Sequence, residues 1–439
     1  MEYKKSYALY ERAQKSIAGG HLSNFKQKAG NPQTFFERVE GSKLYDVDGN
    51  EYIDFSLASG PCILGQSNPA LQNAIIEQMK KCYSRTFSLI QVEAAELFCE
   101  YVNSADRMRF STSGGEGILY ALRTARAYTG KNMVVRFMGQ YFGGTDIVLG
   151  GIPKDQNSCR AQDNYDQNDV YSQACYTSGR AKHALDDCYL LEFNDLPALE
   201  KLFQEDDDIA CVIMEPVALN ISGCVGEPGF YQGVRELCTK YGVVLIFDET
   251  LTGFRIDLRS AQGYFGVTPD MSTFAKAIGG GFPVSAFGGK KEIMDVLAEC
   301  KAIIPGTYNG NCLSAAAMKA TITELAKNDG EIYPQLFALG DLFKEGVLEA
   351  AKRHGVPMIM QGFPAALFPV FTEKERIRNH REAILYSDLP RMYRFGSLMK
   401  QHGVIGDDRY CISAAHTESD IYRAIEAANK SLKIIAEEM

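Results

Sequence analysis

Val243-Val-Leu-Ile-Phe-Asp248 is the stretch that decides the fold, because five consecutive apolar residues end at a carboxylate. A continuous apolar run of this length is typical of a strand that is buried on both faces of a parallel sheet. Such a strand delivers its last residue to the edge where open α/β sheets bind their ligands. The sequence therefore predicts Asp248 at the ligand-binding edge of an α/β sheet.

Lys276 is the second residue whose side chain could take part in catalysis. It lies in the stretch Pro269–Pro283, shortly before the glycines that begin at Gly279. A lysine amine can form a Schiff base with the aldehyde of pyridoxal 5′-phosphate (PLP). A carboxylate can keep the ring nitrogen of the same cofactor protonated, so that the ring accepts electrons. We therefore predict a PLP site in which Lys276 and Asp248 are the catalytic residues.

A glycine turn in Phe110-Ser-Thr-Ser-Gly-Gly-Glu116 lies between a strand-like segment and a helical pattern over residues 115–129. Backbone amides at such a helix N-terminus are suited to a phosphate, and glycines let the backbone approach it closely. Any connection between a strand and a helix can use Gly-Gly, so the turn alone leaves that alternative open. Together with the lysine and the aspartate it predicts Ser113, Gly114 and Gly115 as a phosphate-binding turn.

Tyr141 follows the predicted strand Met133–Met138, in Gly139-Gln-Tyr-Phe-Gly-Gly144. An aromatic side chain at the C-terminal end of a strand can stack on a ring-shaped cofactor. An ordinary buried tyrosine is the alternative interpretation of this position.

Composition excludes several other classes of protein. The 439 residues carry a formal net charge of −9, which argues against nucleic acid or an anionic membrane as the main partner. The 12 cysteines contain no Cys-x-x-Cys pair, and the six histidines show no metal-ligand spacing, so we expect no metal. We expect His354, His380 and His402 at the surface. The polar first residues and the lack of a long apolar run predict a cytoplasmic protein.

The chain pattern predicts two domains. Helical and strand-type segments alternate through most of its length, which favours an α/β architecture. From about residue 312 the pattern is mainly helical, and it ends in an amphipathic helix. We expect residues 1–64 and 311–439 to form a small domain together, and residues 65–310 to form the large PLP-binding domain. The strands expected in the large domain are Met133–Met138, Ile209–Met214 and Val243–Phe247.

The chain resembles the class III, fold-type I family of PLP-dependent aminotransferases, and most closely its glutamate-1-semialdehyde 2,1-aminomutase-like branch. The resemblance runs from Gly41-Ser-Lys-Leu-Tyr-Asp-Val-Asp-Gly-Asn50 through Pro269–Pro283 to Ile412-Ser-Ala-Ala-His416. It implies an α/β large domain with a mostly parallel seven-stranded sheet flanked by helices. It also implies a small α+β domain formed by both chain ends.

The resemblance also implies roles for single residues. Lys276 matches the Schiff-base lysine, and Asp248 matches the partner of the pyridine nitrogen. Asn220 matches an asparagine near the cofactor's phenolic oxygen. Thr307 matches a threonine that reaches the phosphate of the neighbouring subunit's cofactor, which implies a homodimer with shared active sites. The cofactor-binding residues expected on this basis are Ser113, Gly114, Gly115, Tyr141, Asn220, Asp248, Thr250, Lys276 and Thr307.

Substrate contacts are expected at both ends of the chain. Ser23 and Lys26 lie where the aminomutase carries a substrate-binding arginine. Arg409 lies where related aminotransferases place an arginine that binds a carboxylate. A surface arginine that pairs with Asp407 or Asp408 is the alternative for Arg409.

Four residues depart from the family pattern. Gly115 replaces a threonine of the phosphate turn, Phe142 replaces a histidine, and Thr250 stands where a valine is usual. Lys26 replaces the arginine, and a lysine cannot make the two-pronged contact of a guanidinium with a carboxylate. These departures favour amino-group transfer between an amino acid or amine and a keto acid over the aminomutase reaction.

Other functions remain as alternatives. Intramolecular amine transfer, as in glutamate-1-semialdehyde 2,1-aminomutase, and amino-acid racemisation or epimerisation use the same catalytic residues. A nucleotide-binding dehydrogenase requires Gly-x-Gly-x-x-Gly after a first strand, an arrangement that the glycines of this chain do not have. A non-catalytic scaffold would bury a lysine and an aspartate without a ligand, which is costly.

Overall fold

The computed structural model describes residues 1–22, 34–84, 86–155, 158–162, 177–406 and 408–439. These residues divide into two compact units. The larger unit comprises residues 70–333 and 376–387. The smaller unit comprises residues 1–69, 334–375 and 388–439.

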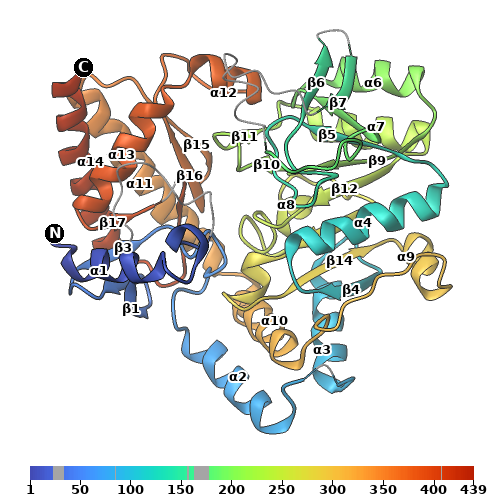
Figure 1. Ribbon diagram of the computed structural model, residues 1–439, viewed down its shortest axis with the longest axis horizontal. Coiled ribbons are helices and arrows are strands. Elements are labelled where there is room, and N and C mark those ends of the chain that lie inside the picture. Colours follow the sequence, from blue (N-terminus) through green and yellow to red (C-terminus); the bar gives the residue numbers. More distant parts are fainter. Residues whose placement is uncertain (23–33, 85, 156–157, 163–176, 407) are drawn as a thin grey trace. The chain divides into compact units, whose positions relative to one another are not determined.

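A nine-stranded sheet forms the centre of the larger unit, in the order β4-β14-β13-β12-β9-β5-β8-β7-β6 (Figure 1). The strands β13, β12, β9, β5 and β8 run parallel, and β14 is antiparallel to both of its neighbours. The seven strands from β4 to β8 in this order form the mostly parallel seven-stranded sheet that the family resemblance implies, so that expectation is confirmed. Two further strands, β7 and β6, extend the sheet beyond β8. The strands are β4 (Arg107–Ser111), β5 (Met133–Phe137), β6 (Ile152–Asp155), β7 (Ser158–Gln162), β8 (Cys188–Leu191), β9 (Ile209–Met214), β12 (Val244–Asp248), β13 (Met271–Phe274) and β14 (Ser285–Gly289).

The central strands are buried along their whole length because helices cover the sheet. Every residue of β9 and β12 is buried, as their continuous apolar runs predict. Helix α4 packs on β14, β13, β12 and β9, and α7 packs on β12. The other elements of the unit are short connections or outer helices. The helical elements are α2 (Pro69–Lys81), α3 (Leu89–Tyr101), α4 (Gly114–Thr129), α6 (Leu196–Glu205), α7 (Phe230–Tyr241), α8 (Ser260–Tyr264), η3 (Lys276–Gly279), α9 (Lys291–Ala298), α10 (Cys312–Leu325), η4 (Lys327–Asp329) and α12 (His380–Tyr386), and a two-stranded ribbon consists of β10 (Val217–Ala218) and β11 (Cys224–Val225).

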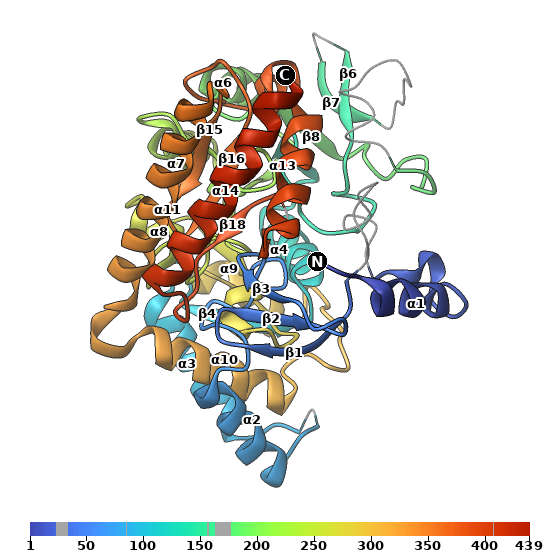
Figure 2. The same ribbon diagram turned by 90° about the vertical axis from the view of Figure 1, so that its left-hand side faces the viewer.

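The smaller unit joins segments from both ends of the chain (Figures 1 and 2). Its first sheet has the order β1-β2-β3-β17, and β17 pairs in parallel with β3 at Val404 and Ile53. The Asp48-Gly49-Asn50 turn joins β2 to β3 as a hairpin. Helices α13 and α14 pack side by side in this unit (Figure 2). Its elements are α1 (Lys4–Ala13), η1 (Ala18–Gly20), β1 (Phe36–Glu40), β2 (Lys43–Asp46), β3 (Glu51–Asp54), α11 (Ile332–His354), β15 (Ile359–Phe363), β16 (Ala366–Val370), α13 (Leu389–Gln401), β17 (Val404–Ile405), β18 (Tyr410–Cys411) and α14 (Glu418–Glu438).

The second boundary between the units lies later in the chain than the domain boundary that we expected after residue 310. Helix α10 packs on α3 and on η3, so it belongs to the larger unit, and the smaller unit resumes at Pro334. Helical periodicity shows that residues after 312 form helices, but it does not show which sheet or helix those helices pack on. The expected domain limits of 64 and 310 therefore stay a proposal.

His380 is buried, so its expected surface position is wrong. Its side chain fills the space beside Gly139, where an added Cβ would lie 2.4 Å from His380 Cδ2. Burial lowers the pKa of His380 to about 4. His402 is exposed and His354 is partly exposed. No helix among the described residues is both long and apolar enough to cross a membrane.

Candidate functional site

Asp248 ends strand β12, and its neighbour in the register of β13 is Thr273. The Oδ1 atom of Asp248 accepts hydrogen bonds from the Thr273 hydroxyl (3.0 Å) and the Thr250 backbone amide (2.9 Å). Burial raises the pKa of Asp248, and these donors and the nearby Lys276 oppose that rise. The carboxylate is therefore held in one orientation at the C-terminal edge of the sheet, as the sequence predicts.

Lys276 follows β13, the strand beside β12, and begins the short helix η3. Its φ angle is +48°, in the left-handed region that residues other than glycine rarely adopt. Backbone strain of this kind persists only where the surrounding structure enforces it, and it is concentrated at functional sites. The lysine interacts electrostatically with both Asp248 and Glu215, which shows that the three side chains share one environment.

The glycine turn at the start of α4 lies against the same edge. Ser113 caps the helix, because its Oγ accepts a hydrogen bond from the Glu116 amide at 3.3 Å. A Cβ added at Gly114 would lie 3.4 Å from the side chains of both Thr250 and Ala275, the residue before Lys276. The N-terminus of a 16-residue helix is therefore directed at the segment that carries the lysine.

Gly115 packs closely on a second glycine turn. A Cβ added at Gly143 would lie 2.7 Å from Gly115 Cα, so these two backbones touch. Phe142, beside Gly143, is buried in the hydrophobic core with residues of α4. Gly115 and Phe142, which depart from the family pattern, therefore both lie where these two turns pack together.

Glu215 is a buried carboxylate that the sequence analysis did not select. Its Oε1 accepts hydrogen bonds from the Tyr141 amide (2.7 Å) and from Asn220 Nδ2 (2.8 Å), and its Oε2 accepts one from the Leu219 amide (3.1 Å). Gln140 pairs with both backbone groups of Glu215. One carboxylate therefore links the segments that carry Tyr141 and Asn220. Glu215 comes directly after the buried strand β9, much as Asp248 comes at the end of the buried strand β12, and this position is the signal that would have identified it.

Burial raises the pKa of Glu215 to about 7. The amide donors and Lys276 lower that pKa, whereas the nearby Asp248 raises it further. Tyr141 is 39% exposed, so the alternative of an ordinary buried tyrosine does not apply. At one end of the sheet, the structure therefore brings Lys276, Asp248 and Glu215 together with the segments that carry Tyr141 and Asn220.

The remaining predicted residues are Thr307, Arg409, Ser23 and Lys26. Thr307 is exposed on the segment before α10 of the larger unit. Arg409 belongs to the smaller unit, where its side chain is 12% exposed, its Nε lies 3.6 Å from Asp408 Oδ1, and its guanidinium lies over the Phe368 ring. Ser23 and Lys26 lie outside the described residues. Within the described part of the chain, no group of three His, Cys, Asp or Glu side chains is placed to hold a metal ion.

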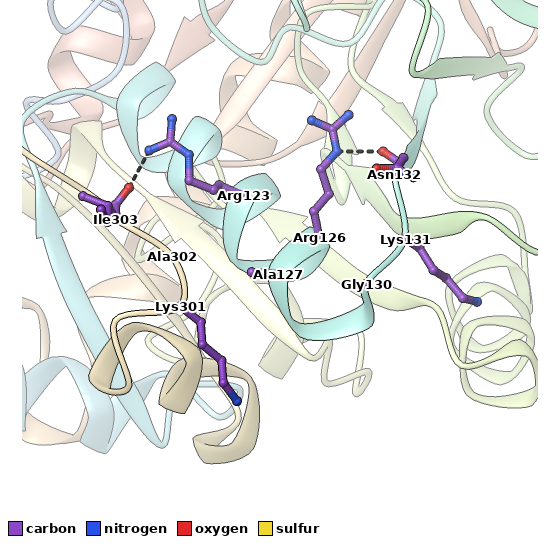
Figure 3. A pocket seen from close by; sticks show the side chains of 9 residues that line it. All are labelled: Arg123, Arg126, Ala127, Gly130, Lys131, Asn132, Lys301, Ala302 and Ile303. Atoms are coloured by element: carbon purple, nitrogen blue, oxygen red, sulfur yellow. Dashed lines mark hydrogen bonds between the residues drawn. The ribbon is translucent and has the colours of Figure 1, made fainter.

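A pocket lies at the other end of α4, away from the glycine turn (Figure 3). The Arg123 guanidinium donates to the Ile303 carbonyl at 2.6 Å, and Arg126 donates to the Asn132 carbonyl at 2.7 Å. This basic surface contains none of the predicted site residues. The pocket is lined by Arg123, Arg126, Ala127, Gly130, Lys131, Asn132, Lys301, Ala302 and Ile303.

Comparison with known proteins identifies one family. The family model described as "Aminotransferase class-III" matches residues 25–390. Glutamate-1-semialdehyde 2,1-aminomutase 2 of Lachnoclostridium phytofermentans is 35% identical, and the alignment covers 98% of this chain and 99% of that protein. The enzyme of the same name from Bacillus pumilus is 37% identical, with 98% and 97% covered.

Solved structures show the same fold. An omega-transaminase from Sphaerobacter thermophilus superimposes with a TM-score of 0.89, at 27% identity over 98% of both chains. A glutamate-1-semialdehyde aminomutase from Pseudomonas aeruginosa superimposes with a TM-score of 0.86, at 25% identity over 98% of this chain and 94% of that one. The fold-type I architecture is confirmed, and both transaminases and aminomutases are among the relatives.

Proposed function

Since the chain belongs to the class III aminotransferase family of PLP-dependent enzymes, we propose that it transfers an amino group between an amino acid or amine and a keto acid. The observation that carries this proposal is the placement of Lys276 and Asp248 at the ends of neighbouring strands, beside the N-terminus of α4. Small-molecule amino and keto compounds are the substrates of such a site.

The residues at the sheet edge fit PLP. The space beside Gly114 has no Cβ to fill it, and the buried hydroxyl of Thr250 lies next to it. Backbone amides of the turn at Ser113, Gly114 and Gly115 would hold the phosphate, with Thr250 beside them. Asp248 would hold the ring nitrogen in its protonated form. Tyr141 and Asn220 would contact the ring and its phenolic oxygen.

The bound cofactor supplies an electron sink for the substrate's bonds. Lys276 would carry the proton, since its Nζ would accept the proton from the substrate's Cα and deliver it elsewhere in the site. Asp248 would keep a negative charge fixed at the sheet edge, which would stabilise a proton on the ring nitrogen of the bound cofactor. Glu215 acts as a positioning residue, because one of its oxygen atoms holds both the Tyr141 backbone and the Asn220 side chain.

The choice between transamination and intramolecular amine transfer depends on the substrate. The relatives from Lachnoclostridium phytofermentans and Bacillus pumilus are named as aminomutases, whereas the omega-transaminase from Sphaerobacter thermophilus is similar in its structure. Three residues favour transamination: Gly115, Phe142 and Lys26, none of which matches the aminomutase pattern. A racemase or epimerase requires no keto acid acceptor, so a test of whether turnover needs a keto acid also tests that alternative.

A substrate panel tests the proposed function. The holoenzyme is mixed with α- and β-amino acids, amines and glutamate 1-semialdehyde, with and without 2-oxoglutarate or pyruvate. We expect the cofactor to be converted to its aminated form by an amino donor, and turnover to require a keto acid. Turnover of the semialdehyde alone to 5-aminolevulinate, with no requirement for a keto acid, would show that the chain is an aminomutase.

Arg409 is the proposed contact for the substrate's carboxylate. The Arg409 Nε atom lies 3.6 Å from Asp408 Oδ1, which is a long ion pair, and partly exposed pairs of this kind contribute little to stability. We expect Arg409→Ala to raise KM for carboxylate substrates about 10-fold or more and to leave the cofactor's absorption spectrum unchanged. Arg423→Ala, which removes an exposed arginine paired with Glu51, is the control. Equal KM values for the two variants would contradict the assignment.

We propose a homodimer in which Thr307 reaches the phosphate site of the second copy. Large apolar side chains flank Thr307 at the surface, since Ile303 is 72% exposed and Tyr308 is 70% exposed. Exposed apolar side chains of this size are typical of interaction surfaces. A cytoplasmic location stays a prediction from the sequence.

We expect sedimentation equilibrium to give twice the chain mass of 48.6 kDa. Ile303→Asp should raise the Kd of the dimer at least about 10-fold, because a charge would enter an apolar contact. Tyr422→Ser, which removes an exposed aromatic side chain of α14, should leave that Kd unchanged. A monomer that retains the cofactor and full activity would refute the dimer.

The raised pKa of Glu215 gives a prediction about stability. Because the folded protein holds this proton more tightly than the unfolded chain does, the free energy of unfolding should fall as pH rises from about 4.5 to about 7. Glu215→Gln cannot ionise, so this part of the pH dependence should disappear in the cofactor-free variant. Chemical denaturation at several pH values measures it. Because Glu249 is buried with a pKa of about 7 as well, only the difference between wild type and variant is informative. Parallel curves for the two proteins would contradict the assignment.

A further inference from the structure

Two cysteines of the larger unit lie with their sulfur atoms 3.5 Å apart, although they are 230 positions apart in the sequence. Cys82 follows the last residue of α2, and Cys312 is the first residue of α10. Neither residue has a part in the proposed amino-group transfer. Most other described cysteines lie within the core as single apolar side chains.

Hydrogen bonds fix the two segments that carry this pair. The Cys312 amide donates to the Ser84 carbonyl at 3.3 Å, and Asn311 Nδ2 donates to the Tyr83 carbonyl at 2.9 Å. The Cys312 thiol donates to the Thr86 carbonyl at 3.4 Å. These contacts keep the end of α2 and the start of α10 together, so the short distance between the two sulfur atoms is maintained by the surrounding backbone.

The two thiols differ in access to solvent. Cys312 is fully buried, whereas Cys82 is partly exposed. The contact with Cys312, and a further hydrogen bond with Thr86, lower the pKa of the Cys82 thiol. Burial instead raises the pKa of Cys99 to about 11 and that of Cys211 to about 12. Since a thiolate is the reactive form of cysteine, Cys82 is suited to react first and Cys312 to react second.

We propose that Cys82 and Cys312 form a redox-active dithiol site that takes a low-molecular-weight disulfide, such as oxidised glutathione, as its oxidant. The Cys82 thiolate attacks one sulfur of that disulfide, the oxidant's S–S bond breaks, and one thiolate leaves. The Cys312 thiolate then attacks Cys82 Sγ and displaces the second thiolate. The two protein thiols are oxidised by two electrons, the oxidant is reduced to two thiols, and these take up the two protons.

The geometry requires a small movement. A disulfide has an S–S length of about 2.05 Å, so the two sulfur atoms must approach each other by about 1.5 Å. The bond would fasten the end of α2 to the start of α10, directly after the exposed segment that carries Thr307. Disulfides in reducing compartments are mostly transient and redox-sensing, and a partly exposed pair fits that class.

The test uses the holoenzyme in buffers of graded oxidised-to-reduced glutathione ratio, quenched with acid, alkylated and mapped by mass spectrometry. We expect two alkylatable thiols to be lost together, with one linked peptide pair that contains Cys82 and Cys312. Dithiothreitol should restore both thiols. Cys82→Ser and Cys312→Ser should each prevent the linkage, and Cys312→Ser should instead accumulate glutathione on Cys82.

Cys300 provides the matched control, because it is an exposed cysteine with no neighbouring thiol among the described residues. Cys300→Ser should leave the linked peptide pair unchanged. The proposal is overturned if Cys300 of the wild type takes up glutathione while Cys82 and Cys312 stay reduced. It is also overturned if the pair reacts only after denaturation, which would mean that the assembled protein covers it.

Discussion

Replacing Lys276 with alanine should reduce the turnover of every amino donor by at least about 10³-fold, since it removes both the covalent attachment of the cofactor and the proton carrier. The fold should persist, because Lys276 lies at a connection at the sheet edge and not within a strand. Its strained backbone does not depend on the amine.

Borohydride reduction and peptide mapping measure the attachment directly. In the wild-type holoenzyme the reduced pyridoxyl group should map to Lys276, and in the alanine variant no lysine should carry it. Lys301→Ala is the control, because Lys301 is an exposed lysine paired with Glu299. A pyridoxyl group on any other lysine of the wild type would disprove the assignment.

Asp248→Asn should reduce kcat by about 10²–10³-fold, which corresponds to about 2.7–4 kcal/mol of lost stabilisation in the transition state. The asparagine oxygen can still accept the hydrogen bonds from Thr250 and Thr273, so the geometry persists while the negative charge is lost. Without that charge the ring nitrogen is no longer held in its protonated form.

Steady-state kinetics and the cofactor's absorption spectrum measure this effect together. The free energy of unfolding of the cofactor-free variant should not decrease, because burial disfavours the charged form of Asp248. Asp295→Asn is the control, since Asp295 pairs with Lys291 at 2.8 Å at the surface. Full activity of the Asp248 variant would remove this residue from the mechanism.

Patterns local to one strand or turn were sufficient to predict much of the site. The apolar run before Asp248 and the Gly-Gly turn at the start of α4 each predict an element and the edge where its functional residue lies. The order of the parallel strands then brings Asp248 and Lys276 together, because Asp248 ends β12 and Lys276 follows the neighbouring strand β13. The family resemblance added Asn220, which no local pattern identifies.

Long-range packing explains what the sequence analysis missed. His380 is separated from Gly139 by 241 positions, so nothing in its own segment indicates that it fills a space beside that glycine. Glu215 likewise binds Tyr141, which lies 74 positions away. Helix α10 has the periodicity of any buried helix, and only the observed contacts place it on α3.

The parallel pairing of β17 with β3 has a consequence for the synthesis of the chain. About 350 residues separate the two strands, a stretch that takes roughly 20 to 70 s to translate at typical rates. Until then the free edge of β3 has unpaired amides and carbonyls, which can pair with another nascent chain. Most of the larger unit, residues 70–333, is continuous and precedes β17. The sheet of the larger unit can therefore fold on the ribosome before β17 is synthesised, while β3 still lacks its partner strand. Aggregation at the β3 edge then competes with folding.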